Sequence, residues 1–131
     1  MDTQKIILIS MNDNTKRSRI QSLCSTLGIG TKLISGNQFT YSLGYLGGIR
    51  GIPAHGQDDA DPKISAPLSL SVPEILIFQG MTSRELDVFL DAYKQAGIAP
   101  VALKAIITPT NVFWSVHKLH RELQAERLSL L

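Results

Sequence analysis

Four short apolar runs, each followed by a polar turn, set the pattern of the chain. They occupy residues 5–10, 31–35, 74–79 and 101–108, and β-branched residues are frequent within them. Continuous apolar runs of this length are typical of strands that are covered on both faces, as in the sheet of an α/β protein. The sequence therefore predicts four buried strands.

Apolar residues at helical spacing fill the intervals between these strands. Two of the predicted helices have clear ends: Thr82-Ser83-Arg84-Glu85 matches a capping box, and Gly28 and Gly97 supply the left-handed residue that stops a helix. The segment after Asn37 has weaker signals, because Gly44 interrupts it. The apolar positions are Ile20, Leu23, Cys24 and Leu27; Phe39, Leu43 and Leu46; Leu86, Phe89, Leu90 and Tyr93; and Val112, Val116, Leu119 and Leu123.

The two halves of the chain share one order of elements, which predicts an internal repeat. Gly28-Ile29 and Gly97-Ile98 lie 69 residues apart, and the first and third apolar runs have the same separation. Sequential β-α-β connections are right-handed, so each half should form a parallel strand pair with a helix across it. We predict a single three-layer α/β domain over residues 1–131, with a four-stranded, mostly parallel sheet of order 2-1-3-4. Repeat 1 spans about 4–48 and repeat 2 about 74–128.

A long irregular segment of about 49–73 separates the two repeats. Glycines and prolines punctuate it, and His55, Asp58, Asp59 and Asp61 stand in its middle. These side chains are able in principle to ligate a hard cation, but nothing in the sequence holds them in place, so we interpret the segment as a flexible acidic loop and predict no metal.

Composition and charge exclude several classes of protein. No apolar run approaches the length of a membrane span, no secretory signal is visible, and these features indicate a soluble cytoplasmic protein that does not bind membranes. A net charge of +2 is too small to imply nucleic acid binding by itself, so nucleic acid is an unlikely partner and is kept only as a minor option. The single cysteine, Cys24, lies on an inward helical stripe, where we expect it to be buried and inert.

Polar turns after the predicted strands are the candidate ligand-binding positions. In an open parallel sheet, ligands bind beyond the carboxyl ends of the strands, where the strand order reverses. Helix N-termini at that rim would suit an anionic ligand, although capping alone also explains these turns. Lys104 has two interpretations, a charge that blocks edge-to-edge pairing or an ammonium group directed at the rim. The tentative ligand-binding residues are Asn12, Gln79, Gly80, Lys104, Thr108, Thr110 and Asn111.

A catalytic constellation is missing from the sequence. There is no Gly-x-Gly-x-x-Gly after the first strand, no Walker sequence and no Gly-x-Ser-x-Gly elbow, so no cofactor is predicted. His117 and His120 are three residues apart, within reach of a shared metal, but a solvated basic helix is the preferred interpretation. Trp114 is expected to be at least half buried, where it would anchor the last helix to the sheet.

The phrase Leu103-Lys104-Ala105-Ile106-Ile107-Thr108-Pro109-Thr110-Asn111, followed by Trp114 and preceded by Phe78-x-Gly80, resembles a short bacterial domain family of unknown function. The resemblance is strongest from Pro73 to about Glu126, and it implies a small cytoplasmic bacterial protein without transferring any catalytic residue. We therefore predict a noncatalytic binding or interaction module with an unknown protein partner. The alternatives are an enzyme or regulator that binds a small anionic or nucleotide-like ligand at the rim, and a homodimer formed through an edge strand or the helix with Tyr41 and Tyr45.

Overall fold

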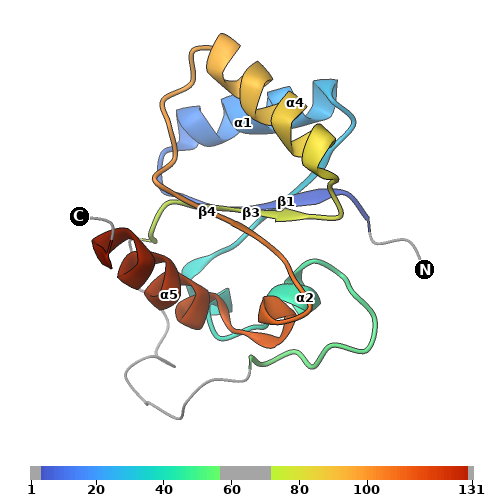
Figure 1. Cartoon of the computed structure of the whole chain (residues 1–131), viewed down its shortest axis with the longest axis vertical. Helices are drawn as coiled ribbons and strands as arrows, with labels where there is room; N and C mark the ends of the chain where they lie inside the picture. The colour runs from blue at the N-terminus through green and yellow to red at the C-terminus, as the bar shows by residue number, and fades with distance from the viewer. Residues whose placement is uncertain (1–3, 57–71, 130–131) are drawn as a thin grey trace.

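The computed structural model describes residues 4–56 and 72–129, which form a four-stranded sheet with helices on both faces (Figure 1). The elements are β1 (Ile6–Ser10), α1 (Asn14–Thr26), β2 (Gly30–Leu33), the 3-10 turn η1 (Gly36–Gln38), α2 (Leu43–Leu46), β3 (Ile75–Gln79), α4 (Ser83–Gln95), β4 (Leu103–Ile106), the 3-10 turn η2 (Asn111–Phe113) and α5 (Val116–Ser129).

The strand order β2-β1-β3-β4 confirms the predicted order, but the sheet is mixed. β1 pairs with β2 and β3 pairs with β4 in parallel, whereas the central pair of β1 and β3 is antiparallel. The expectation of a mostly parallel sheet is corrected at this pair. A strand that is covered on both faces has the same apolar pattern in either direction, so the sequence of β3 did not reveal its direction.

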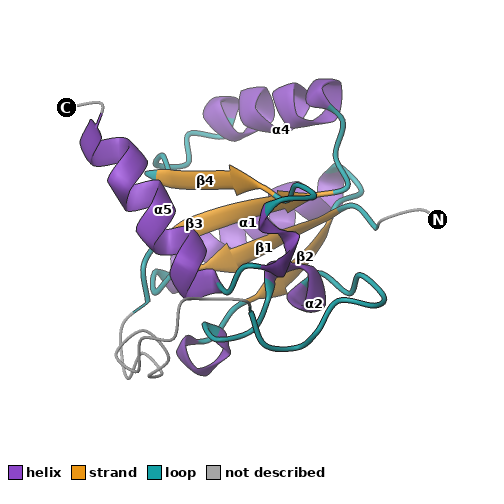
Figure 2. Ribbon diagram, turned by 60° about the horizontal axis from the view of Figure 1, so that its bottom comes forward, coloured by secondary structure: helices purple, strands orange, loops and turns teal. Residues whose placement is uncertain are grey.

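Two hydrophobic cores lie on opposite faces of the sheet. α1 and α4 cover one face, and α2 and α5 cover the other (Figures 1 and 2). Side chains of the central strands alternate between the cores: Ile7, Ile9, Leu76 and Phe78 face α1 and α4, whereas Leu8, Ile75 and Ile77 face α2 and α5. The fold is therefore α/β with three layers.

α1 and α4 begin and end with the same local chemistry. Asp13 caps α1 by accepting a hydrogen bond from the Lys16 amide, and Thr82 and Glu85 form the predicted capping box of α4. Each helix has 13 residues, and each connection to the next strand passes through a glycine with φ of 72°, Gly28 or Gly97. Only glycine adopts this backbone conformation without steric cost.

The halves are arranged about a local twofold axis that is perpendicular to the sheet. Leu8 pairs with Ile77 at the centre of the antiparallel ladder, and these two residues are 69 positions apart, which is the separation between the matching apolar runs of the two halves. On the side of the sheet covered by α2 and α5, Ser42 and Ser115 form an antiparallel bridge. In this bridge the Leu43 amide donates to the Trp114 carbonyl, and the Val116 amide donates to the Tyr41 carbonyl. Because the axis is perpendicular to the sheet, α1 and α4 share one face.

The same bridge explains why two predicted helices are interrupted. A continuous helix was expected after Asn37 and another from Val112, but each half has a 3-10 turn, a short extended segment and then an α-helix. The extended segments are the ones that pair at Ser42 and Ser115, and each serine hydroxyl then caps the helix that follows it. Pairing between the halves therefore replaces one turn of helix in each.

The first part of the predicted loop packs against the segment that leads into α2. The Ser42 amide donates to the Ala54 carbonyl, the Gly56 amide donates to the Thr40 carbonyl, and the His55 ring makes an edge contact with Tyr41. The remainder of the loop, including Asp58, Asp59 and Asp61, lies outside the described residues.

Two ion pairs occupy equivalent places in the halves with their charges exchanged. Lys5 pairs with Glu85, and Lys16 pairs with Glu74 at 2.7 Å. Lys5 corresponds to Glu74, and Lys16 to Glu85, under the 69-residue repeat. Opposite charges thus meet at both places, where two identical halves would have placed like charges together.

Acid should weaken the fold through Glu85. The Lys5 ammonium and the Thr82 amide hold the pKa of Glu85 below its usual range, so its contribution to stability is present above the unfolded-state pKa and is lost as the pH falls through the folded-state pKa. We expect Glu85→Gln to reduce the difference in unfolding free energy between pH 7 and pH 3, measured by urea denaturation. Asp87→Asn, on the exposed side of the same helix, is the control. Equal pH profiles for the two variants would contradict the prediction.

Candidate functional site

The seven residues proposed from the sequence do not form one rim. Because β1 and β3 run in opposite directions, the turns after β1 and β2 lie at one end of the sheet, and the turns after β3 and β4 lie at the other. Asn12 is therefore separated from the other six candidates. This geometry corrects the expected rim, and it removes the basis for an anionic ligand held by all four helix N-termini.

Three of the candidates have structural roles. The Asn12 side chain exchanges two hydrogen bonds with the backbone of Val72, which fixes the chain ahead of β3. Gln79 is buried, and its amide donates to the carbonyls of Gln4 and Gly47. Gly80 has φ of 69° and turns the chain from β3 into α4.

The Thr108–Asn111 turn is closed by its own hydrogen bonds. Asn111 Oδ1 accepts from the Thr108 amide at 2.8 Å, and Thr108 Oγ1 accepts from the Asn111 amide at 3.1 Å. Asn111 Nδ2 donates to the Ile106 carbonyl at 2.9 Å, while Thr110 precedes η2 and is exposed. Ser35 and Gln38 form a similar turn after β2. Asn111 therefore ends β4 and satisfies its last outward carbonyl.

β4 is an edge strand, and among the described residues no other strand pairs with its outer side. In a parallel ladder, alternate residues direct their N–H and C=O groups to the neighbouring strand. The Ile107 amide donates to the Phe78 carbonyl of β3, which sets the phase of this alternation. The groups that point outward are thus the N–H and C=O of Lys104 and the N–H of Ile106, because Asn111 already occupies the Ile106 carbonyl.

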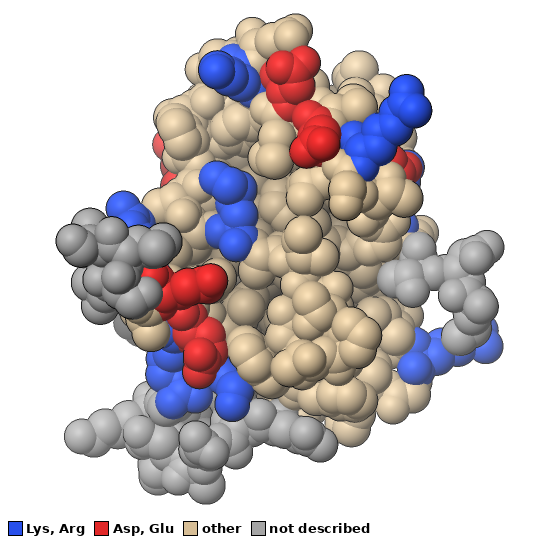
Figure 3. Space-filling view, in the orientation of Figure 1, with Lys and Arg blue, Asp and Glu red and all other residues tan. Residues whose placement is uncertain are grey.

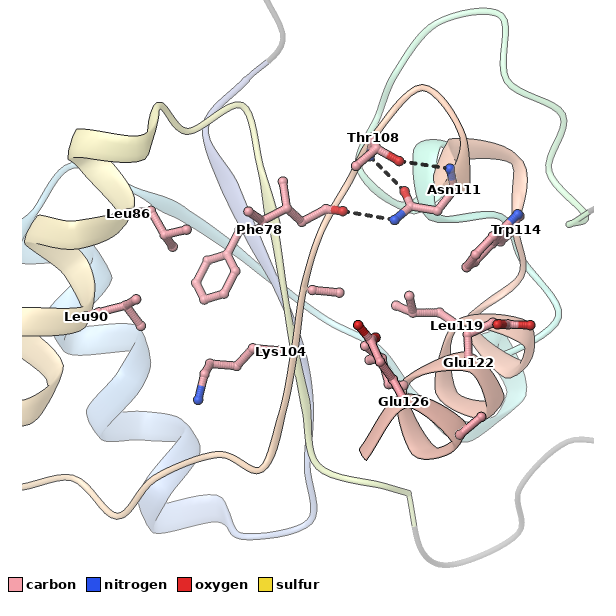
Figure 4. Close-up of a pocket in the computed structure, with 14 residues that line it drawn as sticks. Phe78, Leu86, Leu90, Lys104, Thr108, Asn111, Trp114, Leu119, Glu122 and Glu126 are labelled. Atoms are coloured by element: carbon pink, nitrogen blue, oxygen red, sulfur yellow. Dashed lines mark hydrogen bonds between the residues drawn. The ribbon is translucent and has the colours of Figure 1, made fainter. Parts of the chain in front are cut away.

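A groove of about 820 Å³ runs along this free edge, and we call it the β4 groove (Figure 4). α4 forms one wall and α5 the other, with β4 between them. Only Lys104, Thr108 and Asn111 of the predicted residues line it. The lining residues are Phe78, Leu86, Leu90, Lys104, Ala105, Ile106, Thr108, Asn111, Trp114, Leu119, Glu122, Leu123, Ala125 and Glu126.

Apolar side chains in the β4 groove are unusually accessible for core-type residues. Leu90 is 37% exposed and Ile106 is 50% exposed, although both belong to elements that pack on the sheet. In repeat 1, Arg17 and Gln21 occupy the positions that correspond to Leu86 and Leu90. The fold therefore does not require leucine at these two positions, and the apolar wall is a feature of repeat 2.

A second cavity of about 320 Å³ continues the groove along α4. It shares Leu90 and Lys104 with the β4 groove, and Tyr93 and Val101 line its far end. The Lys104 ammonium donates to the Val101 carbonyl at 2.9 Å, so its aliphatic chain lies along the floor between the two cavities. Lys104 is thus held on the α4 side of the strand and is not directed at the Thr108–Asn111 turn.

Trp114 forms the end of the groove beside η2. Its ring is mostly buried against the core between the sheet and helices α2 and α5, which we call the lower core, and this burial confirms the prediction. The Lys118 ammonium lies 5.1 Å from the ring centroid. The sequence had pointed to Trp114 as an anchor of the last helix but had not indicated that it faces a groove. A position-by-position comparison of the two halves would have identified Leu86 and Leu90 as candidates for this surface, because their counterparts are Arg17 and Gln21.

Cys24, His117 and His120 lie outside the β4 groove and are not gathered into a reactive site. Burial raises the pKa of the Cys24 thiol to about 11, as expected for an inert cysteine. The His117 ring packs against Phe39. The pKa of His120 is lowered, mainly by burial and to a smaller extent by the nearby His117. Within residues 4–56 and 72–129, no group of three or more His, Cys, Asp or Glu side chains is placed to hold a metal ion.

Comparison with known proteins relates the second half of the chain to a family. A family model described as a domain of unknown function (DUF3783) matches residues 74–130, which include β3, α4, β4 and α5. Neither the curated proteins nor the solved structures gave a significant match. In the part of the chain that the structure describes, no helix has both the length and the apolar character needed to cross a membrane.

Proposed function

We propose that this protein is a noncatalytic interaction module that binds an extended segment of a partner protein along β4. The observation that carries the proposal is the combination of outward backbone groups on β4 with a groove whose walls, formed by α4 and α5, lie on both sides of them. A segment that adds to a sheet edge gains main-chain hydrogen bonds from the edge and specificity from side chains that enter neighbouring pockets. The β4 groove supplies both kinds of contact.

Within residues 4–56 and 72–129, no element covers the outer edge of β4, and this supports the proposal. Natural proteins commonly protect an edge with a bulge, a proline, an inward charge or a covering element. From the sequence, Lys104 was a candidate for a charge that blocks edge-to-edge pairing. In the structure its ammonium donates a hydrogen bond to the Val101 carbonyl on the α4 side of the strand. The Lys104 and Ile106 backbone groups are left for a partner strand, and Asn111 limits the pairing to a short stretch.

The polar groups of the groove favour binding over catalysis. Its described polar side chains are Lys104, Thr108, Asn111, Glu122 and Glu126, with no cysteine or histidine among them. Thr108 and Asn111 are bonded to one another. A nucleophile paired with a general base, which acyl or phosphoryl transfer would need, is not formed by these residues.

We further infer that the two halves are copies of one β-α-β-α unit and that the second copy specialised in binding. The matched caps of α1 and α4, the equivalent ion pairs and the Ser42–Ser115 bridge support a common unit. Leu86 and Leu90 in place of Arg17 and Gln21, together with the longer final helix, support specialisation of the second copy. We place this module in the bacterial cytoplasm.

Replacement of Ile106 by proline tests strand addition directly. Proline removes the outward N–H of residue 106 and leaves the hydrogen bonds between β3 and β4 in place, because the Ile106 amide is not part of that ladder. We expect the purified variant to lose at least about tenfold in affinity for ligands selected by the wild-type protein from a phage-displayed library of linear 12-residue peptides. Biolayer interferometry would measure these affinities.

Leu33→Pro is the matched control, because Leu33 occupies the equivalent position at the outer edge of β2. It should carry the same folding penalty while leaving peptide binding intact. Circular dichroism and urea denaturation would show that both variants fold. Peptides that bind wild type and Ile106→Pro equally well, or a library that yields no ligand, would contradict the proposed function.

A further inference from the structure

The two sides of β4 differ in character. Successive residues of a strand point to opposite faces, so Lys104 and Ile106 face α4, whereas Leu103 and Ala105 face α5 and belong to the lower core. Figure 4 shows the Lys104 side chain on the side of Leu86 and Leu90, opposite Glu122 and Glu126. A segment paired with β4 would itself present alternate side chains to these two different walls.

The α4 side is suited to apolar side chains. Leu86, Leu90 and Ile106 form a continuous surface there, which extends into the 320 Å³ cavity lined by Phe89, Tyr93, Ile98 and Val101. A cavity of this size has room for a large aliphatic or aromatic side chain. Leu90 is also partly exposed, so this apolar surface is accessible from solvent.

The α5 side carries negative charge at the same height along the strand. Glu122 and Glu126 are exposed and line the groove one helical turn apart, with Leu119 and Leu123 beneath them. Figure 3 shows acidic side chains over α5, with basic side chains directly below them and uncharged surface beside them on the same face of the molecule. A basic side chain is the complement of two carboxylates at an accessible wall.

We propose that the occupant of the β4 groove is an extended segment of another protein with apolar residues on one face and basic residues on the other. The inference rests on the proposed function. The apolar side chains would enter the α4 side and the second cavity, and lysine or arginine side chains would meet Glu122 and Glu126. The alternation of apolar and basic residues thus determines the register of the bound segment against β4 and which of its two faces is turned toward α4.

A second copy of this chain does not fit these requirements. A copy paired antiparallel through its own β4 keeps α4 on the same side of the joined sheet, so the second copy's Lys104 would face the apolar wall. Its Ala105 would then lie opposite the glutamates. Lys104 is the residue of β4 whose outward N–H and C=O are both available for a partner strand. A symmetric dimer that paired the two Lys104 residues through these groups would place their ammonium groups side by side.

Three fluorescein-labelled synthetic peptides provide the test. Each has nine residues with isoleucine or valine at alternate positions, and the intervening positions are all lysine, all glutamate or all threonine. We expect fluorescence anisotropy at low salt to show that the lysine peptide binds about tenfold more tightly than the threonine peptide, and that the glutamate peptide binds weakest. The double variant Glu122→Lys/Glu126→Lys should reverse this order.

The control variant carries the same change in net charge away from the groove. Asp87→Lys/Asp91→Lys alters two exposed residues of α4 that do not line the groove, and it should keep the wild-type order of affinities. Equal affinities for the three peptides, or an unchanged order in the Glu122/Glu126 variant, would overturn the charge preference while leaving strand addition standing. Failure of all three peptides and of the displayed library would overturn the proposed function itself. Light scattering that showed a dimer disrupted by Ile106→Pro would identify a second copy as the occupant and overturn the inference.

Discussion

Replacing Trp114 with alanine is expected to lower the free energy of unfolding by about 3 to 5 kcal/mol, with the lower end favoured because one edge of the ring faces the groove. The indole packs against the lower core between η2 and α5, where its removal leaves a space that rigid neighbours cannot fill. Lys118 would also lose the ring over which its ammonium lies. Urea denaturation followed by circular dichroism would measure the change, since the variant lacks the only tryptophan.

Val88→Ala is the appropriate comparison for this loss. Val88 is 51% exposed on α4, so its truncation removes little buried surface and should change stability by no more than about 0.5 kcal/mol. The bridge between Ser42 and Ser115 should survive in both variants, because its hydrogen bonds involve only backbone atoms. A Trp114→Ala protein as stable as Val88→Ala would show that the ring is a contact residue of the groove with no role in anchoring α5.

The sequence was informative where one residue type meets a local physical requirement. The capping box at Thr82, the glycine stops at Gly28 and Gly97 and the inward position of Cys24 all follow from neighbouring residues, and each is present in the structure. The strand order also followed, because right-handed connections within two repeats leave few arrangements open. These features depend on short-range chemistry or on chain connectivity.

Features that depend on how the halves meet were not visible in the sequence. The direction of β3 relative to β1 is one of them, since a buried apolar strand reads alike in both directions. The interruption of the helices at Ser42 and Ser115 is another, because each serine is an ordinary helix cap until its partner is known. Both errors came from one missing fact, the orientation of the twofold axis.

The candidate site shifted for the same reason. Lys104, Thr108 and Asn111 line the β4 groove, but the groove lies along the edge of β4 and is not a rim beyond the strand ends. Its walls come from Leu90, which the helical pattern assigned to the core, and from Glu122, which is not among the apolar positions predicted for the last helix. Whether an apolar residue of a helix is exposed depends on how far the neighbouring strand and helix extend to cover it. The periodicity of apolar residues along one helix does not contain that information.

Substitution of Gly47 by alanine is expected to destabilise the fold by about 2 to 4 kcal/mol. Gly47 is buried at the end of α2 with φ of −81°, a conformation that alanine adopts readily, so any cost is steric. An added Cβ would overlap Oε1 of Gln79, whose amide also donates to the Gly47 carbonyl at 2.9 Å. Gln79 would have to leave its place and break its hydrogen bonds to Gly47 and Gln4. Gly48→Ala, with φ of 77° and open space at the Cβ position, should cost only about 1 kcal/mol of backbone strain.

A double-mutant cycle separates the steric explanation from a general intolerance of the α2 end. In a Gln79→Ala background the Gly47→Ala side chain has nothing to overlap, so we expect the second substitution to cost less than about 1 kcal/mol and the two changes to be strongly non-additive. Urea denaturation of the four proteins would give the coupling free energy. Additive effects would mean that the close approach of Gly47 and Gln79 does not hold in solution, and Gln79, freed from a structural role, would return as a candidate ligand-binding residue.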